Sequence, residues 1–151
     1  MVIYIGADHR GFKLKESILD FLKNKGYEVA DMGNVNYDQN DDYIDFAKEV
    51  VGKVSMDPVN SRGILVCGSG VGMDVVANKV KKIRSVLAIS PDHVYTARHD
   101  DNVNILSIAA NFINEADAQK IINVFLETPF STEERYQRRL DKIAQMENES
   151  H

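Results

Sequence analysis

The chain alternates short, uninterrupted apolar runs with longer segments in which apolar residues recur every three or four positions. The run VIYIG at 2–6 ends in glycine, and apolar residues then recur at helical spacing from Phe12 to Leu22, before a stop signal at Gly26. Uninterrupted apolar runs are typical of strands buried on both faces, whereas the wider spacing is typical of amphipathic helices. The pattern therefore predicts a buried strand followed by a helix.

The same pattern repeats to give five strand–helix units. Strands are predicted at 2–6, 27–32, 63–67, 85–89 and 104–110. Helices are predicted at 12–22, 43–54, 71–79, 92–98 and 116–126, and a last helix begins at Thr132. Buried strands separated by helices form a parallel sheet with right-handed crossovers. We expect an α/β fold: a three-layer Rossmann-like sandwich of five parallel strands in the order 2-1-3-4-5, with helices on both faces and a C-terminal helix.

Length and composition narrow the class of protein. The chain has 151 residues, of which 44% are hydrophobic and 27% charged, which suits a single domain over 1–151 with a frayed tail from about 145. The net charge of −5 disfavours nucleic acid and anionic membranes as partners. The N-terminus lacks a signal-peptide pattern, and no apolar run could span a bilayer. We therefore expect a cytoplasmic protein that binds neither nucleic acid nor membrane.

Two loops with dense polar chemistry follow the first and third predicted strands. GADHRG covers 6–11 and CGSGVG covers 67–72. In an open parallel sheet, ligands bind beyond the carboxyl ends of the strands, at the point where the strand order reverses. With the expected order, that point lies between the first and third strands. The sequence therefore predicts that the two loops lie side by side and form one site.

The glycine-rich loop has two interpretations. Gly68, Gly70 and Gly72 occupy alternate positions where a strand turns into a helix. Such a turn lets backbone N–H groups approach an anion closely, although glycines also serve a tight turn that binds nothing. The spacing matches neither GxGxxG nor GxxxxGK, which argues against a dinucleotide or nucleotide-phosphate loop. Three glycines at alternate positions favour the anion site.

The residues around this loop also allow a structural or a chemical role. A lone cysteine is usually a small buried hydrophobe, but Cys67 ends a strand beside a helix N-terminus, where a lowered pKa would make it a nucleophile or a base. Asp8 suits a turn cap, or it orients His9 or binds a sugar hydroxyl. His9 is either solvated or able to grip a phosphate or move a proton. Arg10 is either a surface residue or an anion contact.

Two later segments carry further candidates. RHDDNVN at 98–104 is either a solvated polar loop or a cover over the site, and its adjacent histidine and aspartates do not suit a metal because neighbouring loop residues rarely converge on one ion. Arg135 and Arg139 are spaced i, i+4, so they share one helix face and suit a phosphate. The alternative for the arginines is an exposed face with ion pairs to nearby glutamates.

In combination, the segments ADHRGFKLK, GILVCGSGVGMDVVANK, RHDDNVNIL and TPF with a following RxxxR resemble the ribose-5-phosphate isomerase B / LacAB sugar-phosphate isomerase family over nearly the whole chain. The resemblance implies a homodimer or tetramer that interconverts an aldose and a ketose phosphate without metal or cofactor. Ribose 5-phosphate to ribulose 5-phosphate is the leading reaction. Galactose or allose 6-phosphate isomerisation, a regulatory homologue that binds sugar phosphate with little turnover, and a redox-sensing thiol protein stay open.

The resemblance also implies a role for each candidate residue. Cys67 would move the proton between C1 and C2, and the Ser69 hydroxyl would assist ring opening. Backbone amides from Gly68 to Gly72 would stabilise the enediolate, Asp8 would hold the sugar, and part of the site would come from the partner chain. The substrate-binding residues implied are Asp8, His9, Arg10, Gly68, Gly70, Val71, Gly72, Asp101, Asn111, Arg135 and Arg139. The chemistry independently needs a base, donors for the enediolate, a ring-opening group and a phosphate clamp.

Three positions depart from the family pattern. Members often carry HND or HNN before the fifth strand, and the histidine opens the sugar ring. An ungapped alignment puts Asp100 at that histidine and Asp101 at the asparagine, while His99 lies one residue early. An arginine that is frequent after the fifth strand is Asn111 here, and Tyr136 replaces a histidine near the last helix. We therefore expect ring opening by Asp100 or His99 and one phosphate contact fewer.

Overall fold

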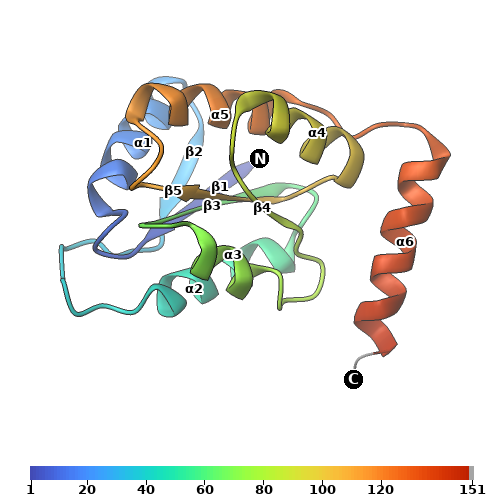
Figure 1. Cartoon of the computed structure of the whole chain (residues 1–151), viewed down its shortest axis with the longest axis horizontal. Helices are drawn as coiled ribbons and strands as arrows, with labels where there is room; N and C mark the ends of the chain where they lie inside the picture. The colour runs from blue at the N-terminus through green and yellow to red at the C-terminus, as the bar shows by residue number, and fades with distance from the viewer. Residues whose placement is uncertain (150–151) are drawn as a thin grey trace.

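The computed structural model describes residues 1–149 and contains a five-stranded sheet in which every neighbouring pair of strands is parallel (Figure 1). The strands are β1 (Val2–Ala7), β2 (Glu28–Asp31), β3 (Ser61–Cys67), β4 (Ser85–Leu87) and β5 (Ile105–Ala109). The helices are α1 (Phe12–Asn24), α2 (Tyr43–Met56), α3 (Val71–Ala77), α4 (Pro91–Asp101), α5 (Glu115–Glu127) and α6 (Glu134–Glu149). The predicted α/β class and the alternation of strands and helices are confirmed.

The strand order is β2-β1-β3-β5-β4, so the expected order 2-1-3-4-5 is wrong at one edge. β5 pairs with β3, from Gly63 opposite Ile105 to Cys67 opposite Ala109, and β4 pairs only with β5. A central strand is covered on both faces. All five residues of β5 are buried, whereas the three residues of β4 are only half-buried, so β5 suits the inner position. The reversal point between β1 and β3 is unaffected.

Helices cover both faces of the sheet. α1, α4 and α5 lie on one face, and α2 and α3 lie on the other (Figure 1). Each interface has its own apolar core, one built around Ile18, Leu22 and Phe125 and the other around Val50 and Met73. The strand residues between them are buried on both faces, which explains why their sequences are continuous apolar runs rather than alternating patterns.

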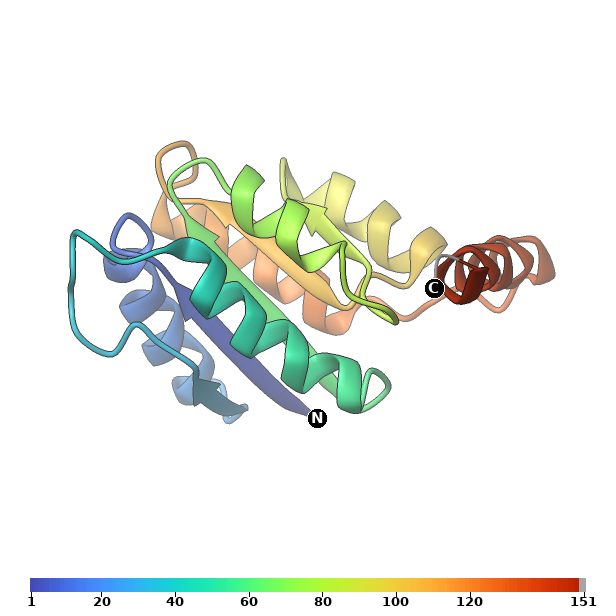
Figure 2. The same cartoon turned by 90° about the horizontal axis from the view of Figure 1, so that it is seen from below.

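The last helix lies at one end of the molecule, away from the loop that joins β2 to α2 (Figures 1 and 2). α6 buries Tyr136 and Leu140 and continues through Glu149, so the tail expected from about 145 is helical up to that residue; residues 150 and 151 lie outside the described part of the chain. The segment 98–104 is also more ordered than expected, since α4 continues through Asp101. Among residues 1–149, no helix is long and apolar enough to cross a membrane.

Candidate active site

The loops after β1 and β3 lie side by side, as the sequence predicts. β1 and β3 pair in parallel along their lengths, and Ala7 lies opposite Val66 at the last pair. The backbones then stay so close that a Cβ added to Gly11 would lie 2.1 Å from the carbonyl oxygen of Val66. Parallel pairing therefore brings the loop with Asp8 against the loop that begins at Cys67.

The glycine-rich turn between β3 and α3 depends on glycine for both backbone shape and space. Gly70 has φ of 74°, in the left-handed region that side chains disfavour, and a Cβ there would lie 2.4 Å from Leu87. A Cβ on Gly72 would lie 2.6 Å from the ring of Tyr43, which begins α2. The Arg10 and Asn111 side chains pack beside Gly68. Side chains from several elements pack so closely around this turn that its glycines leave no room for a Cβ atom.

Cys67 is 4% exposed at the end of β3, and burial raises the pKa of its thiol above the ordinary value. The backbone N–H groups of Met73, Gly70 and Ser69 bond toward the sulfur and lower the pKa, while the charge of Asp8 raises it. The hypothesis of a lowered pKa is therefore wrong, because desolvation outweighs the N–H groups of the turn. The thiolate, once formed, is a stronger base than an ordinary one and has three N–H groups around it.

Asp8 combines the two roles that the sequence left open. It is 6% exposed, and its Oδ1 accepts hydrogen bonds from the backbone N–H groups of Arg10 and Gly11, each at 3.0 Å. This carboxylate therefore shapes the turn into α1. It also lies near enough to Cys67 to act on the thiol pKa, and its Oδ2 has no hydrogen bond to another described residue. One oxygen holds the loop, and the other is left for a ligand.

His9 is held by Asp41, which the sequence analysis missed. The Nδ1 atom of His9 lies 2.7 Å from Oδ1 of Asp41, and the His9 backbone N–H donates to the same oxygen at 3.1 Å. The Asp41 side chain is 5% exposed, and its Oδ2 is buried without a hydrogen-bond partner among the described residues. A carboxylate at Nδ1 fixes the ring and leaves Nε2 for a ligand. No local pattern marks Asp41, because it lies 32 residues from His9 within a polar loop.

Asp8, His9 and Asp41 also form a group that could hold a metal ion, with one ligand atom from each within 4.8 Å of the others. Hydrogen bonds occupy Nδ1 of His9 and Oδ1 of Asp8, whereas Nε2 of His9 and Oδ2 of both aspartates have no hydrogen bond to another described residue. The bond between His9 and Asp41 accounts for the close approach of these two side chains.

The remaining candidates gather around the end of α4 and the start of α6. Nδ1 of His99 lies 2.7 Å from Oδ1 of Asp100, and the His99 ring stacks on Tyr95 and meets Tyr136 edge-on. The Arg135 and Arg139 guanidinium groups lie 4.7 and 5.5 Å from the centre of the Tyr136 ring. Tyr136, known from the sequence only as a departure from the family pattern, therefore connects the histidine to both arginines.

Asp101 is the next residue of the same cluster. Partial burial and the neighbouring charge of Asp100 raise the pKa of its carboxyl, and Arg139 and Arg84 oppose this. Its backbone carbonyl oxygen accepts a hydrogen bond from Nε of Arg84. Asp101 therefore lies within reach of Arg139 but is tied to the end of α4.

The candidates around Cys67 lie at the carboxyl ends of the strands, and the candidates around His99 lie at the amino ends. α4 ends at Asp101, just before β5 begins, whereas Cys67 pairs with Ala109 at the far end of β5. The five residues of β5 span about 13 Å at roughly 3.3 Å per residue. One chain therefore does not bring His99 and Arg139 to the loop that holds Cys67 and His9.

Comparisons with known proteins agree with the resemblance seen in the sequence. The Ribose/Galactose Isomerase family matches residues 3–143. A probable ribose-5-phosphate isomerase B of Mycoplasma genitalium is 41% identical over 148 residues, covering 98% of this chain and 97% of the relative. The ribose-5-phosphate isomerase B of Mycobacterium tuberculosis is 39% identical over 147 residues, covering 97% of this chain and 90% of the relative.

Solved structures give the same result for the fold. The ribose-5-phosphate isomerase B of Mycoplasma genitalium with bound ribulose 5-phosphate has a TM-score of 0.94 to this chain at 41% identity, covering 98% of this chain and 97% of its own. The ribose-5-phosphate isomerase B of Clostridium thermocellum also has a TM-score of 0.94, at 34% identity over 100% of both chains. The Rossmann-like fold is therefore shared along the full length.

Proposed function

This chain belongs to the Ribose/Galactose Isomerase family, and from that premise we propose that it converts ribose 5-phosphate to ribulose 5-phosphate. The observation that carries the proposal is the pairing of β1 with β3, which places a buried thiol and its backbone N–H groups beside Asp8 and the oriented His9. A relative of the same length and fold binds ribulose 5-phosphate. The pairing supplies a base and an anion-binding loop at one edge of the sheet.

The proposed reaction moves the C2 proton to C1 and the O2 hydroxyl proton to O1, and it needs no oxidant. Cys67, as a thiolate, removes the proton from C2 of the open-chain aldose, and the electrons of that C–H bond form the C1–C2 double bond of an enediolate. The O2 hydroxyl proton passes to O1, and the thiol returns its proton to C1 as the electrons of the double bond form the new C1–H bond and O2 becomes the C2 carbonyl of the ketose. A buried sulfur suits this transfer, because water does not compete for the proton.

Donors in the glycine-rich loop would stabilise the charge of the enediolate. Three backbone N–H groups lie against the sulfur of Cys67, so they would stabilise the thiolate before proton transfer. Gly68 and Gly72 provide the further N–H groups that we assign to the enediolate oxygens. Ser69 is exposed at the turn, where its hydroxyl would assist ring opening.

Ring opening needs an acid near the ring oxygen, and the contact between His99 and Asp100 suggests a role for each residue. Because Asp100 bonds to Nδ1 of His99, we assign the proton transfer to His99 and the orientation of its ring to Asp100. The stacked ring of Tyr95 would hold His99 in place from the other side. The histidine then acts one position earlier than in the family pattern, with the carboxylate as its support.

The phosphate would be held from two chains. His9 lies in the loop that packs beside the loop of Cys67, whereas Arg135 and Arg139 lie with His99 at the opposite ends of the strands. We propose a homodimer in which His99, Arg135 and Arg139 of one chain complete the site around Cys67 of the other. Asn111, beside Gly68, stands where an arginine would add a further phosphate contact. We also propose a cytoplasmic location, because a reducing compartment keeps the Cys67 thiol free.

An isomerase assay tests this function. Wild type and Cys67→Ala would be incubated with ribose 5-phosphate and, in parallel, with galactose and allose 6-phosphate, and ketose formation measured. We expect turnover of ribose 5-phosphate and a loss in kcat of about 10²- to 10⁴-fold in the variant. Undiminished turnover in Cys67→Ala would refute the base assignment. Turnover of the 6-phosphates alone would change the substrate, and binding without any turnover would identify a regulatory homologue.

A further inference from the structure

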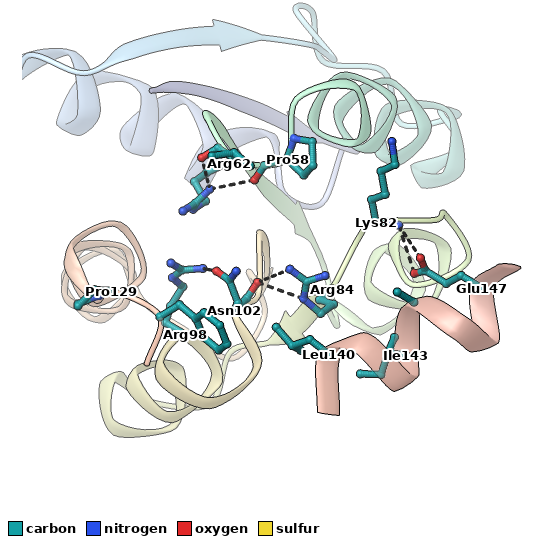
Figure 3. Close-up of a pocket in the computed structure, with 13 residues that line it drawn as sticks. Pro58, Arg62, Lys82, Arg84, Arg98, Asn102, Pro129, Leu140, Ile143 and Glu147 are labelled. Atoms are coloured by element: carbon teal, nitrogen blue, oxygen red, sulfur yellow. Dashed lines mark hydrogen bonds between the residues drawn. The ribbon is translucent and has the colours of Figure 1, made fainter. Parts of the chain in front are cut away.

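A second cavity lies at the opposite edge of the sheet from Cys67 and is lined by three arginines (Figure 3). Its volume is about 500 Å³. Arg62 lies near the start of β3, Arg84 just before β4 and Arg98 near the end of α4. The fourth side of the cavity is α6, which contributes Leu140, Ile143 and Ala144. None of the residues assigned to the isomerase site lines this cavity.

Neutral groups accept all the hydrogen bonds that the three guanidinium groups form with described residues. In Arg98, Nε donates to the carbonyl of Thr128, and Nη1 donates to the carbonyl of Val103 and to Oδ1 of Asn102. Arg84 donates from Nε and Nη2 to the carbonyl of Asn102. These bonds fix the arginines in place without pairing any of them directly with a carboxylate.

Arg62 completes the cluster in the same way. Its Nη1 donates to the carbonyl of Ser61 at 2.7 Å and, more weakly, to the carbonyls of Pro58 and Val59. Within residues 1–149, neither Arg62 nor the other two arginines form an ion pair. Glu147 is the one acidic residue in the lining, and it accepts hydrogen bonds from the backbone N–H of Lys82.

The positive charges act on one another. Burial, followed by the charges of Arg62 and Arg84, lowers the pKa of Arg98 to about 10. Burial and the charge of Arg84 also lower the pKa of Arg62. At Arg84, burial lowers the pKa, and the charges of Glu147 and Asp101 raise it by less than burial lowers it. The cavity therefore holds three guanidinium groups against one carboxylate in its lining, in a chain whose net charge is −5.

Each arginine also keeps unused donors. Nη2 of Arg98, Nη1 of Arg84, and Nε and Nη2 of Arg62 form no hydrogen bond with another described residue. Figure 3 shows the ends of Arg62 and Arg98 close together at one side of the cavity and Arg84 nearer its centre. Three guanidinium groups in the lining of one cavity offer enough donors for the several oxygens of a phosphate, which exceed the two of a carboxylate.

We propose that this cavity binds a small organic phosphate monoester. Arg62, Arg84 and Arg98 hold the dianionic phosphate, and the organic part lies against Leu140 and Ile143 of α6. The volume falls within the range of roughly 300–1,000 Å³ that is usual for small-molecule sites. This site is separate from the isomerase site, so its occupation does not depend on turnover.

The test uses nuclear magnetic resonance on the full-length protein with phenyl phosphate as the probe. The Nε–Hε signals of Arg62, Arg84 and Arg98 report on the second cavity, and the backbone amide signals of Gly68 and Gly72 report on the isomerase loop. We expect saturable shifts in the arginine signals with a dissociation constant of their own. Absence of saturable arginine shifts, or shifts confined to the glycine amides, would overturn the proposal.

Two variants with the same change in charge make the test specific. We expect Arg62→Gln to weaken phenyl phosphate binding at the remaining arginine signals by about tenfold, because it removes a charged donor. Arg138→Gln is the control, since Arg138 is exposed on α6 and pairs only with Glu134 at 3.8 Å. Equal weakening in both variants would show general attraction to a positive surface and would refute a built site.

A third variant and a second probe test the two halves of the ligand. Ala144→Glu places a carboxylate on the exposed α6 wall and should weaken binding without disturbing the core. Inorganic phosphate should bind more weakly than phenyl phosphate, because it gains nothing from the apolar wall. Equal affinity for the two probes would overturn the monoester assignment. Arginine shifts that follow protein concentration without any probe would show that a second copy of the chain fills the cavity, and the proposal would fail.

Discussion

The orientation of His9 depends on a single carboxylate from a distant loop. Asp41 accepts hydrogen bonds from both the ring and the backbone N–H of His9 through the same oxygen. The side chain of Asp41 is nearly fully buried, so the interaction is shielded from water and salt. Asp41 thus acts through His9 as a positioning residue for the proposed phosphate contact.

We expect Asp41→Asn to raise KM for ribose 5-phosphate by roughly tenfold, because it removes a charged hydrogen-bond partner of His9. The value of kcat should change much less, since Cys67 is untouched. Steady-state kinetics separate the two constants. Asp38→Asn is the matched control in the same loop, where the only hydrogen bond of the Asp38 side chain to another described residue is from the backbone N–H of Asn40. Equal effects of the two substitutions, or a fall in kcat alone, would contradict the positioning role.

The burial of the Cys67 sulfur leads to a prediction about how activity depends on pH. Burial raises the pKa of the thiol, so the thiolate fraction at neutral pH is smaller than for an ordinary cysteine. Because proton removal needs the thiolate, kcat/KM should increase with pH and should not level off below about 8.5, the ordinary pKa of a thiol. The ultraviolet absorbance of the thiolate gives the pKa directly, since Cys67 is the only cysteine in the chain. A pH profile that levels off in the neutral range would show that a thiol with a raised pKa does not control the activity.

At the scale of elements, the site depends on how closely the loops after β1 and β3 approach. Gly11 precedes α1 and lies against the backbone of Val66, which cannot move without disturbing β3. Gly70 supplies the left-handed backbone that turns β3 into α3. These contacts set how closely the loops that carry Asp8 and Cys67 approach each other.

We expect Gly11→Ala to lower the free energy of unfolding by about 2–4 kcal/mol, because the added Cβ meets a backbone oxygen at 2.1 Å. Gly52→Ala is the control. Gly52 lies inside α2 with nothing within 4 Å of an added Cβ, so the substitution should raise the free energy of unfolding by about 0.5–1 kcal/mol. Urea denaturation measures both. A neutral Gly11→Ala would show that the loops separate easily.

For the whole molecule, the two groups of site residues act together only if two chains combine. Cys67 and His9 lie at the carboxyl edge of the sheet, and His99 and Arg139 lie at its amino edge. α6, which carries Arg139, stands at the end of the molecule (Figure 2). Two-fold symmetry would allow the residues around His99 in each chain to complete the site around Cys67 in its partner.

Mixed dimers test this arrangement. Cys67→Ala and Arg139→Ala should each be nearly inactive alone. After unfolding and refolding together in equal amounts, half of the dimers are mixed and each mixed dimer has one intact site, so about a quarter of the wild-type activity should return. Sedimentation would establish that dimers form. Refolded mixtures that stay inactive while dimeric would show that each site is built within one chain.

Local patterns were sufficient for most elements but not for their arrangement or their ends. Apolar runs and helical spacing predicted all five strands and the helices between them. The exchange of β4 and β5 was missed, because pairing depends on burial across the sheet and not on chain order. The extension of α4 through Asp101 was missed because the segment is polar, and the carbonyl groups of Asp101 and Asn102 at the helix end are satisfied by Arg84 from another part of the fold.

The sequence by itself determined the alternation of elements, the glycine-rich turn at Cys67 and the neighbouring loop with Asp8 and His9, because these depend on local spacing and backbone conformation. The tertiary structure decided that Asp41 holds His9, since that contact joins residues far apart in the chain. It also decided the direction of the Cys67 pKa, because desolvation is a property of the packed core and no sequence pattern measures it.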